Sequence, residues 1–264
     1  MKNYKLYRGA WVVDSHPHRS LEIDKKEARA LLNKGGYVVR NIFDFDCQQK
    51  TDFWYIIKDA YGGIEELPTK VRNQVKRSLN SYDFRRLTKE QMLDIGPELF
   101  NKSRERFGVC HYITLEEWNI RLNVHPNLDF WVGFSKENGM PASFSINTLF
   151  DDYCDYNTMG ISPEVPNSTY PMYGLIFEMN RYYLQELRLK YVMDGARSIT
   201  EHSNIQPFLE EKFKFRKAYC DIKVFYKWWL GIAVKILFPF RKWIKNAKIS
   251  AILRQEAWVR DMEQ

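Results

Sequence analysis

Three consecutive stretches of strand-like sequence constrain the fold of this 264-residue chain more than any other feature. They are LDFWVGF (128–134), MPASFSINTLF (140–150) and YCDYNTMGI (153–161). Gly139 and the pair Asp151-Asp152 stand between them, and such residues are typical of hairpin turns. The pattern predicts three antiparallel strands joined by two tight turns.

The middle stretch of the three has two chemically different faces. Apolar or β-branched residues alternate with polar ones, Phe144, Ile146 and Thr148 against Ser143, Ser145 and Asn147. Alternation by twos places each set on its own face of a strand. We expect the polar face to meet a ligand cleft.

Helices and single strands surround this trio. Before it we expect a helix at 67–82, a strand near 83, and two further helices at 89–107 and 114–123. After it we expect a helix at 174–190, a strand at 190–194, a second helix at 203–213 and a last strand at 220–226. The order predicts a mixed α/β (α+β) fold built on a single curved sheet flanked by helices.

The chain divides into three parts by composition. Residues 1–66 form an N-terminal strand/helix extension, whose helix starts at Asp24 with Glu27 three positions on, a capping-box spacing. Residues 67–226 form the main domain. Residues 227–264 form a basic, Trp-rich amphipathic tail, which Pro239 should break into two helices.

Composition excludes several classes of protein. The chain is 45% hydrophobic, enough for a sizeable core, and 40 basic residues against 33 acidic ones give a net charge of +7. Its four cysteines stand far apart with no Cys/His cluster, which indicates reduced thiols and argues against a zinc site. We see neither a secretory signal nor an apolar run of 18 residues, and therefore expect a cytoplasmic protein.

Basic residues concentrate at two places. Lys70, Arg72, Lys76 and Arg77 fill the outer face of the helix expected at 67–82. This face is either simply solvated or a patch for a polyanion such as a phosphate-bearing donor, RNA or anionic lipid. The tail carries eight basic and three acidic residues and four of the eight tryptophans. It suits either an anionic membrane surface at the inner face of the plasma membrane or packing against the domain or a second copy.

Two motifs resemble known acyltransferases. LEEKFKF (209–215), with Asn204 ahead of it, resembles the late helix-to-strand motif of the GNAT acyltransferase superfamily, whose element order is also the one expected here. LPTKVRNQVKRSL (67–79) followed by YDFRRL (82–87) resembles the basic helix and first strand of Fem-type aminoacyltransferases, which are GNAT-fold relatives. The resemblance implies a GNAT-like fold over residues 65–226 and transfer of an acyl group to an amine.

The resemblance also implies where a donor binds. In the superfamily, backbone amides at the start of the central helix hold the pyrophosphate of coenzyme A. The corresponding place here reads STYPMYG (168–174). Tyr170, Tyr173 and Gly174 are our candidates for donor binding there, because tyrosines can stack on an adenine or a tRNA base.

The densest polar stretch is DGARSITEHSN (194–204), between a strand end and a helix start. The candidates for donor binding in it are Arg197, Ser198 and Asn204. The candidates for catalysis are Asp194 and His202 in this stretch, Glu164 after the third hairpin strand, and Tyr219 as a phenol near the sheet end. The alternative is that Asn204 caps a helix, Asp194 ends a strand and Glu164 lies in a turn.

These observations together predict an N-acyltransferase that acts on an amine of a cell-envelope or polysaccharide precursor, a sugar or a peptide. The expected donor is acetyl-CoA or another acyl-CoA, with no metal. Aminoacyl-tRNA as donor, and a non-catalytic binding protein of the same fold, remain the alternatives. A homodimer is compatible with the sequence.

Overall fold

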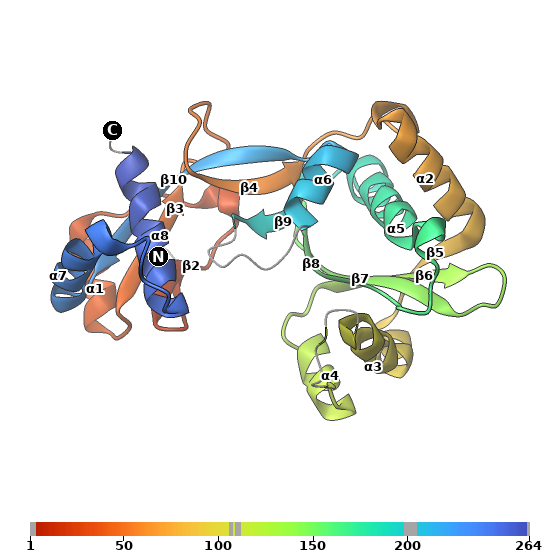
Figure 1. Cartoon of the computed structure of the whole chain (residues 1–264), viewed down its shortest axis with the longest axis horizontal. Helices are drawn as coiled ribbons and strands as arrows, with labels where there is room; N and C mark the ends of the chain where they lie inside the picture. Colours follow the sequence, from red (N-terminus) through yellow and green to blue (C-terminus); the bar gives the residue numbers. More distant parts are fainter. Residues whose placement is uncertain (1–3, 106–107, 109–111, 198–204, 263–264) are drawn as a thin grey trace. The chain divides into compact units, whose positions relative to one another are not determined.

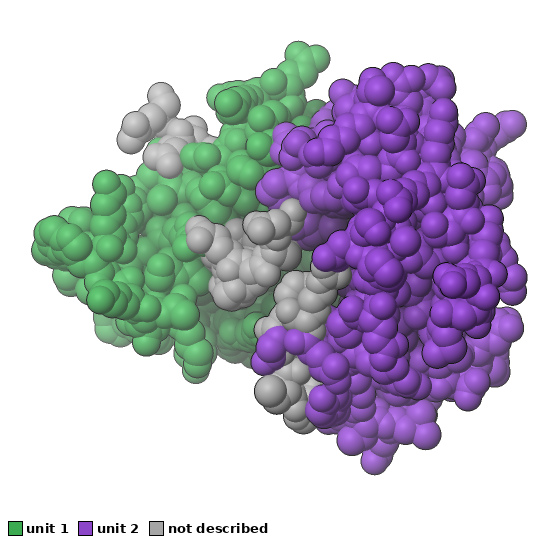
Figure 2. Space-filling view, turned by 45° about the vertical axis from the view of Figure 1, so that its right-hand side comes forward, with its two compact units in different colours: residues 1–56, 196–204, 217–264 green, residues 57–195, 205–216 purple. Residues whose placement is uncertain are grey.

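A computed structural model describes residues 4–105, 108, 112–197 and 205–262. The chain forms two compact units, shown in Figure 2. Unit 1 comprises residues 1–56, 196–204 and 217–264, and unit 2 comprises residues 57–195 and 205–216. Each unit is thus assembled from segments that lie far apart in the sequence.

Unit 2 is built on five strands in the order β9-β8-β7-β6-β5. These are β5 (Tyr82–Leu87), β6 (Leu128–Ser135), β7 (Pro141–Leu149), β8 (Tyr153–Ile161) and β9 (Tyr191–Ala196). β5 to β8 are antiparallel neighbours, while β8 and β9 run parallel. The three hairpin-linked strands predicted from the alternating stretches are therefore confirmed.

Helices cover both faces of this sheet (Figure 1). One face carries α2 (Thr69–Ser81), α5 (Pro171–Asn180) and its continuation as a π-helix, η4 (Arg181–Glu186). The other carries α3 (Lys89–Glu105) and α4 (Leu115–Leu122). Below that second face, Phe100 and Trp118 pack with Phe144 and Ile146 of β7 in one buried cluster. We refer to the two faces as the α5 face and the α3/α4 face.

The polar face of β7 does not line a cleft. Ser143, Ser145 and Asn147 are fully buried, and α5 packs over β7. Ser145 donates a hydrogen bond to Asn147 Oδ1 (2.6 Å), and Asn147 donates to Tyr183 Oη (3.0 Å) on η4. The expectation of a ligand cleft was wrong because α5 covers this face, where Ser145 and Asn147 are satisfied by side chains while Ser143 Oγ has no hydrogen-bond partner among the described residues. The alternation pattern alone cannot distinguish such buried polar residues from solvated ones.

Unit 1 contains a smaller mixed sheet. Its strands, in spatial order, are β1 (Tyr4–Tyr7), β2 (Ala10–Val13), β3 (Val38–Phe43), β10 (Arg216–Tyr226) and β4 (Phe53–Lys58). α1 (Lys25–Asn33) packs on β3 through Ala28 and Leu32, and its Asp24–Glu27 capping box is present as predicted. Short turns complete the chain at η1 (Pro17–Arg19) in this unit and at η2 (Ile64–Glu66) and η3 (Asn167–Thr169) in unit 2.

The tail is two helices separated at Pro239, as predicted. α7 (Trp228–Leu237) runs into the short turn η5 (Phe238–Phe240), and α8 (Ala247–Met262) follows. α8 belongs to the unit 1 core, since Trp258 packs with Phe53 and Cys220 in one buried cluster. Among the helices described, none combines the length and the apolar character that crossing a bilayer needs.

Some boundaries differ from those expected. α5 begins at Pro171, three residues before the expected start, because proline fits the first turn of a helix. β10 begins at Arg216, four residues before the expected start. A mixed α/β architecture with a large open sheet flanked by helices is nevertheless what the sequence predicted.

Candidate functional site

β8 and β9 pair over only a short part of their lengths. Tyr153, Cys154 and Asp155 face Tyr191, Val192 and Met193, whereas β8 continues to Ile161 and β9 to Ala196. Beyond these pairs the described parts of the two strands have no common ladder. We call this place the fork: β8 from Asp155 onward and β9 from Asp194 onward. The carboxyl ends of parallel strands, where neighbouring strands diverge, are common ligand sites in α/β proteins.

Two carboxyl groups flank the fork. Asp155 lies opposite Thr148 of β7 and so shares the α3/α4 face. Asp194 follows Met193, the register partner of Asp155, and so projects to the α5 face. The side-chain amide of Gln206 on α6 (Ile205–Phe213) reaches Asp194 on that face and also donates to its backbone carbonyl (3.0 Å).

Both carboxyl groups titrate near neutral pH. Burial raises the pKa of Asp155 from 3.8 to about 7, although the Gly195 N–H hydrogen-bonds the carboxylate and opposes the shift. Burial, and then the charge of Asp155, raise the pKa of Asp194 from 3.8 to about 7, against the hydrogen bond from Gln206. At pH 7 each group is therefore able both to accept and to release a proton, which is the property of a general base or acid.

α6 is fixed to the α5 side of the fork by aromatic packing. The Tyr173 ring lies 5.2 Å from that of Phe208 and 5.8 Å from that of Phe213. Phe213 and Phe215 are buried, and Lys214 between them is left-handed (φ 60°). Lys214 thus takes the backbone conformation that glycine normally supplies at a helix end.

Two backbone N–H groups at the start of α5 donate hydrogen bonds within the protein. Gly174 N–H donates to Ser78 Oγ of α2 (3.1 Å), and Tyr173 N–H donates to the carbonyl of Tyr170 (2.9 Å). A Cβ on Gly174 would stand 2.4 Å from the Phe84 ring, so this glycine permits α5 to approach α2 and β5. The rings of Tyr170 and Tyr173 lie edge to face, 5.5 Å apart.

Glu164 makes its contacts with residues other than the two fork carboxylates. It is exposed and forms an ion pair with Lys102 of α3 (3.1 Å). It lines a cavity of about 400 Å³ together with the β6–β7 turn residues Lys136 and Asn138.

Two further predicted residues belong to unit 1. The guanidinium of Arg197 stacks between the rings of Trp54 (4.2 Å) and Trp258 (4.6 Å) and pairs with Asp52 (3.2 Å). Tyr219 on β10 lies edge-on to Trp54, with ring centroids 6.4 Å apart. Ser198, His202 and Asn204 lie outside the described residues.

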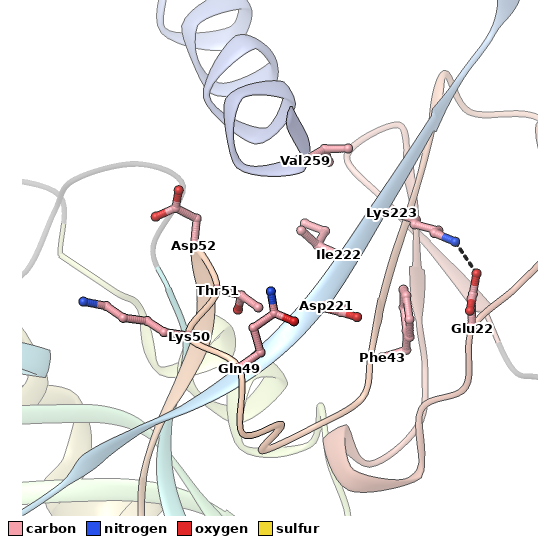
Figure 3. Close-up of a pocket in the computed structure, with 10 residues that line it drawn as sticks. All are labelled: Glu22, Phe43, Gln49, Lys50, Thr51, Asp52, Asp221, Ile222, Lys223 and Val259. Carbon is pink, nitrogen blue, oxygen red and sulfur yellow. Dashed lines mark hydrogen bonds and ion pairs between the residues drawn. The ribbon is translucent and has the colours of Figure 1, made fainter. Parts of the chain in front are cut away.

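Unit 1 has a cavity of its own, about 470 Å³ in volume (Figure 3). Lys223 and Glu22 pair at one side of it, and Val259 of α8 contributes an apolar wall. Burial and the nearby Asp44 raise the pKa of Asp221, which also lines it. The lining mixes both signs of charge. In the described part of the chain, no three His, Cys, Asp or Glu side chains gather as metal ligands would.

Two features of unit 2 were not predicted from the sequence. One is Asp155, a charged residue within the otherwise uncharged strand sequence YCDYNTMGI (153–161), which was the available signal. The other is a network under η4: Arg86 holds Asp129 with two nitrogens (2.8 and 2.9 Å), and Tyr183 and Trp131 also donate to Asp129 (2.5 and 3.2 Å). Its members come from three separate elements, and no spacing in the sequence connects them.

Comparison with known proteins identifies the fold. No family model matches the chain, and no curated protein matches its sequence. Among solved structures, FemX matches with a TM-score of 0.59 at 12% identity, over 86% of this chain and 83% of its own. The C-terminal domain of a putative lysylphosphatidylglycerol synthetase from Agrobacterium fabrum matches with 0.56 at 12% identity, over 89% and 84%. L-PGS from Bacillus licheniformis matches with 0.51 at 13% identity, over 89% and 83%.

These matches confirm the expected GNAT-like fold with Fem-type features. At 12–13% identity the likeness is one of fold. It extends over both units, since each match covers more than four fifths of the chain.

Proposed function

We propose that this chain is an N-acyltransferase, in which the fork between β8 and β9 is the active site. The observation that carries the proposal is the pair Asp155–Asp194, two carboxyl groups with pKa values near 7 at the diverging ends of parallel strands. The fold supports it, because FemX and the synthetase domains share it. The acceptor we propose is an amine of a cell-envelope or polysaccharide precursor.

The chemistry asks little covalent help of the protein. A fork carboxylate takes a proton from the acceptor ammonium, and the neutral nitrogen attacks the donor carbonyl carbon. The C–N bond forms, the C–S bond of a thioester or the C–O bond of an ester breaks, and the protonated carboxyl group returns its proton to the leaving group. The nitrogen, which still carries one proton too many for an amide, releases it to solvent. A group with a pKa near 7 suits both steps, because it is neither a weak base nor a weak acid at that pH.

The other sequence candidates keep their proposed roles. Glu164, His202 and Tyr219 are proposed to assist proton transfer, Tyr219 through its phenol. The donor-binding residues that we propose are Tyr170, Tyr173, Gly174, Arg197, Ser198 and Asn204.

The donor we propose is an acyl-CoA, with aminoacyl-tRNA as the second candidate. The second candidate is favoured by one observation: the Tyr173 and Gly174 amides in the first turn of α5 are engaged by Tyr170 and Ser78. Thermal unfolding in the presence of acetyl-CoA, free coenzyme A or an aminoacyl-tRNA distinguishes the two, since a ligand that binds the folded protein raises the unfolding temperature. Stabilisation by neither donor would contradict the transferase and leave the binding protein.

Replacement of the fork carboxylates tests the site. Asp155→Asn and Asp194→Asn should each lower transfer to a panel of amino sugars and short peptides by about 10² to 10⁴-fold, the usual contribution of a general acid–base group. Donor stabilisation should persist in both variants. Asp83→Asn, which alters an exposed carboxylate on β5, is the matched control and should leave transfer unchanged. Full activity of both fork variants would refute the assignment.

We also propose peripheral membrane contact through a surface that we call the tryptophan face. Six apolar side chains of α7, η5 and the turn after it are exposed, Trp228, Trp229, Ile232, Ile236, Phe240 and Trp243. Trp228 and Trp243 are each 77% exposed. The exposed basic residues Arg241, Lys242 and Lys245 lie beside them, and this combination suits an anionic bilayer.

Point replacement is the sound test of the tryptophan face. Removal of residues 227–264 would also remove Leu253 and Trp258, which are buried in unit 1. Trp228→Ser combined with Trp243→Ser should abolish sedimentation with phosphatidylglycerol vesicles and leave the unfolding temperature unchanged. Undiminished sedimentation of the double variant would contradict the proposal, and a loss of self-association instead would identify the face as a contact between copies.

A further inference from the structure

Two arginines of unit 2 stand against one aromatic ring. The guanidinium carbon of Arg104 on α3 lies 5.4 Å from the centroid of Phe100, and that of Arg121 on α4 lies 5.0 Å from it. Arg121 also donates a hydrogen bond to Thr158 Oγ1 of β8 (2.8 Å). Two helices, and the part of β8 that does not pair with β9, therefore bring two positive charges together.

Neither of these charges is neutralised by a carboxylate among the described residues. Other arginines of the same unit have such partners: Arg85 pairs with Asp83, Arg86 with Asp129 and Arg181 with Glu178. Burial, and then the charge of Arg104, lower the pKa of Arg121. Two guanidiniums that repel each other cost free energy, and an oxyanion between them would recover it through charge-assisted hydrogen bonds.

The pair lies beside the fork, on the side of Asp155. Thr158 faces Ile146 of β7, which is buried against α3 and α4, so it shares the face of Asp155. Thr158 is three positions beyond Asp155 along β8, a distance of roughly 10 Å, and the register shift between Ile146 and Asn147 keeps the two residues on one face. α3 is held closely there, because a Cβ on Gly160 would come within 2.8 Å of Ser103, the residue before Arg104.

We propose that Arg104 and Arg121 bind an oxyanion, a phosphate or carboxylate group, carried by the acceptor about 10 Å from its reacting amine. The assignment to the acceptor rests on the proposed transferase function. The oxyanion site itself does not, and it can be tested without turnover.

Binding is measured with inorganic phosphate and, separately, with acetate, at constant ionic strength. Arginine Nε–Hε resonances followed by NMR should shift saturably in the wild-type protein for at least one of the two anions. Arg104→Gln and Arg121→Gln should each weaken the binding of that anion by about tenfold or more, because one charge-assisted hydrogen-bond partner is lost. The anion that binds more tightly shows whether the site prefers a phosphate or a carboxylate group.

Arg85→Gln is the matched control. Arg85 also stands over a phenylalanine, Phe134 (5.7 Å), in the same unit, but Asp83 neutralises it. The control should bind the anion as tightly as the wild-type protein. No saturable shift with either anion, or an equal loss in the control, would overturn the site.

Transfer assays separate this inference from the proposed function. Arg121→Gln should raise KM for acceptors bearing a phosphate or carboxylate, leave kcat unchanged and leave neutral acceptors unaffected. If anion binding is confirmed but no acceptor is acylated, the site stands and the transferase assignment fails. If acylation occurs and the KM for anionic acceptors does not change, the assignment of the site to the acceptor is wrong.

Discussion

Unit 2 has a buried carboxylate at one place, Asp129, and two half-buried carboxylates at another, the fork, and their hydrogen-bond partners differ. Asp129 lies under η4 with its side chain 7% exposed, and Arg86, Trp131 and Tyr183 all donate hydrogen bonds to it. At the fork, the Asp155 carboxylate receives the Gly195 N–H, and Asp194 receives the Gln206 amide. Among the described residues, a cation pairs with the first site and none pairs with the second.

The difference separates a structural carboxylate from a reactive one. A buried carboxylate that is paired with an arginine and fully hydrogen-bonded holds its neighbours in place. A half-buried carboxylate that has only neutral donors is held near the pH at which it gains or loses a proton, and this is the condition for proton transfer. Depth of burial alone would have indicated Asp129 as the reactive carboxylate, whereas the hydrogen-bond partners indicate the carboxylates of the fork.

The largest effect on stability should come from breaking the Asp129 network. Asp129→Ala leaves Arg86, Tyr183 and Trp131 without their shared acceptor, and should lower the free energy of unfolding by about 2 to 3 kcal/mol. This is less than the cost for a fully buried ion pair, because Arg86 is partly exposed and can be rehydrated. Urea denaturation followed by circular dichroism measures it.

The control for this variant is Asp83→Ala. Asp83 also pairs with an arginine of β5, Arg85, but both side chains are exposed, so the change should cost less than about 1 kcal/mol. Equal losses in the two variants would show that the Asp129 network does not differ from a surface pair.

The next effect concerns the pH dependence of stability at the fork. The pKa of Asp155 and of Asp194 is raised from 3.8 to about 7 on folding, so folding takes up protons between these values. Their favourable contribution is fully present below pH 3.8 and is lost as the pH rises through 7. Asp155→Asn keeps an acceptor for Gly195 and removes the charge, and should raise the unfolding free energy at pH 8 by about 1 kcal/mol or more relative to the wild-type protein.

Urea denaturation at pH 5 and pH 8 measures this difference for Asp155→Asn and Asp194→Asn. Asp83→Asn, at an exposed position, should leave the slope with pH as in the wild-type protein. A wild-type slope in both fork variants would mean that neither group is held near neutrality, and the active-site assignment would lose its basis.

Much of the fold could be predicted because local signals agree with it. Asp24 and Glu27 specify the start of α1, and Pro239 separates α7 from α8. The strands β6, β7 and β8 follow from alternation and turn chemistry. The division into two units could not be predicted, because unit 1 joins the N-terminal residues to β10 and α8. That assembly depends on contacts such as Phe53 with Trp258, which lie about 200 positions apart and leave no local pattern.

The site was predictable in part for the same reason. Asp194 stood out because it ends a strand and opens the densest polar stretch. Asp155 did not, because its role arises from strand register: β8 and β9 separate just after it, and register is a property of two strands together. The buried polar face of β7 was misjudged because a polar residue has the same pattern whether water or another side chain satisfies it.

The smallest effect should distinguish the two places most cleanly. Ser145 Oγ donates to Asn147 Oδ1 within the same sealed network as Tyr183, and Ser145→Ala removes this one hydrogen bond and leaves a buried acceptor unmet. The loss should be about 1 kcal/mol, and it should be the same at pH 5 and pH 8, because no group that titrates between these values is altered. Equal losses at both pH values would show that the sealed network stabilises the unit independently of the fork. A loss that grows with pH would instead mean that the network and the fork carboxylates titrate together, and the contrast between structural and reactive carboxylates would have to be abandoned.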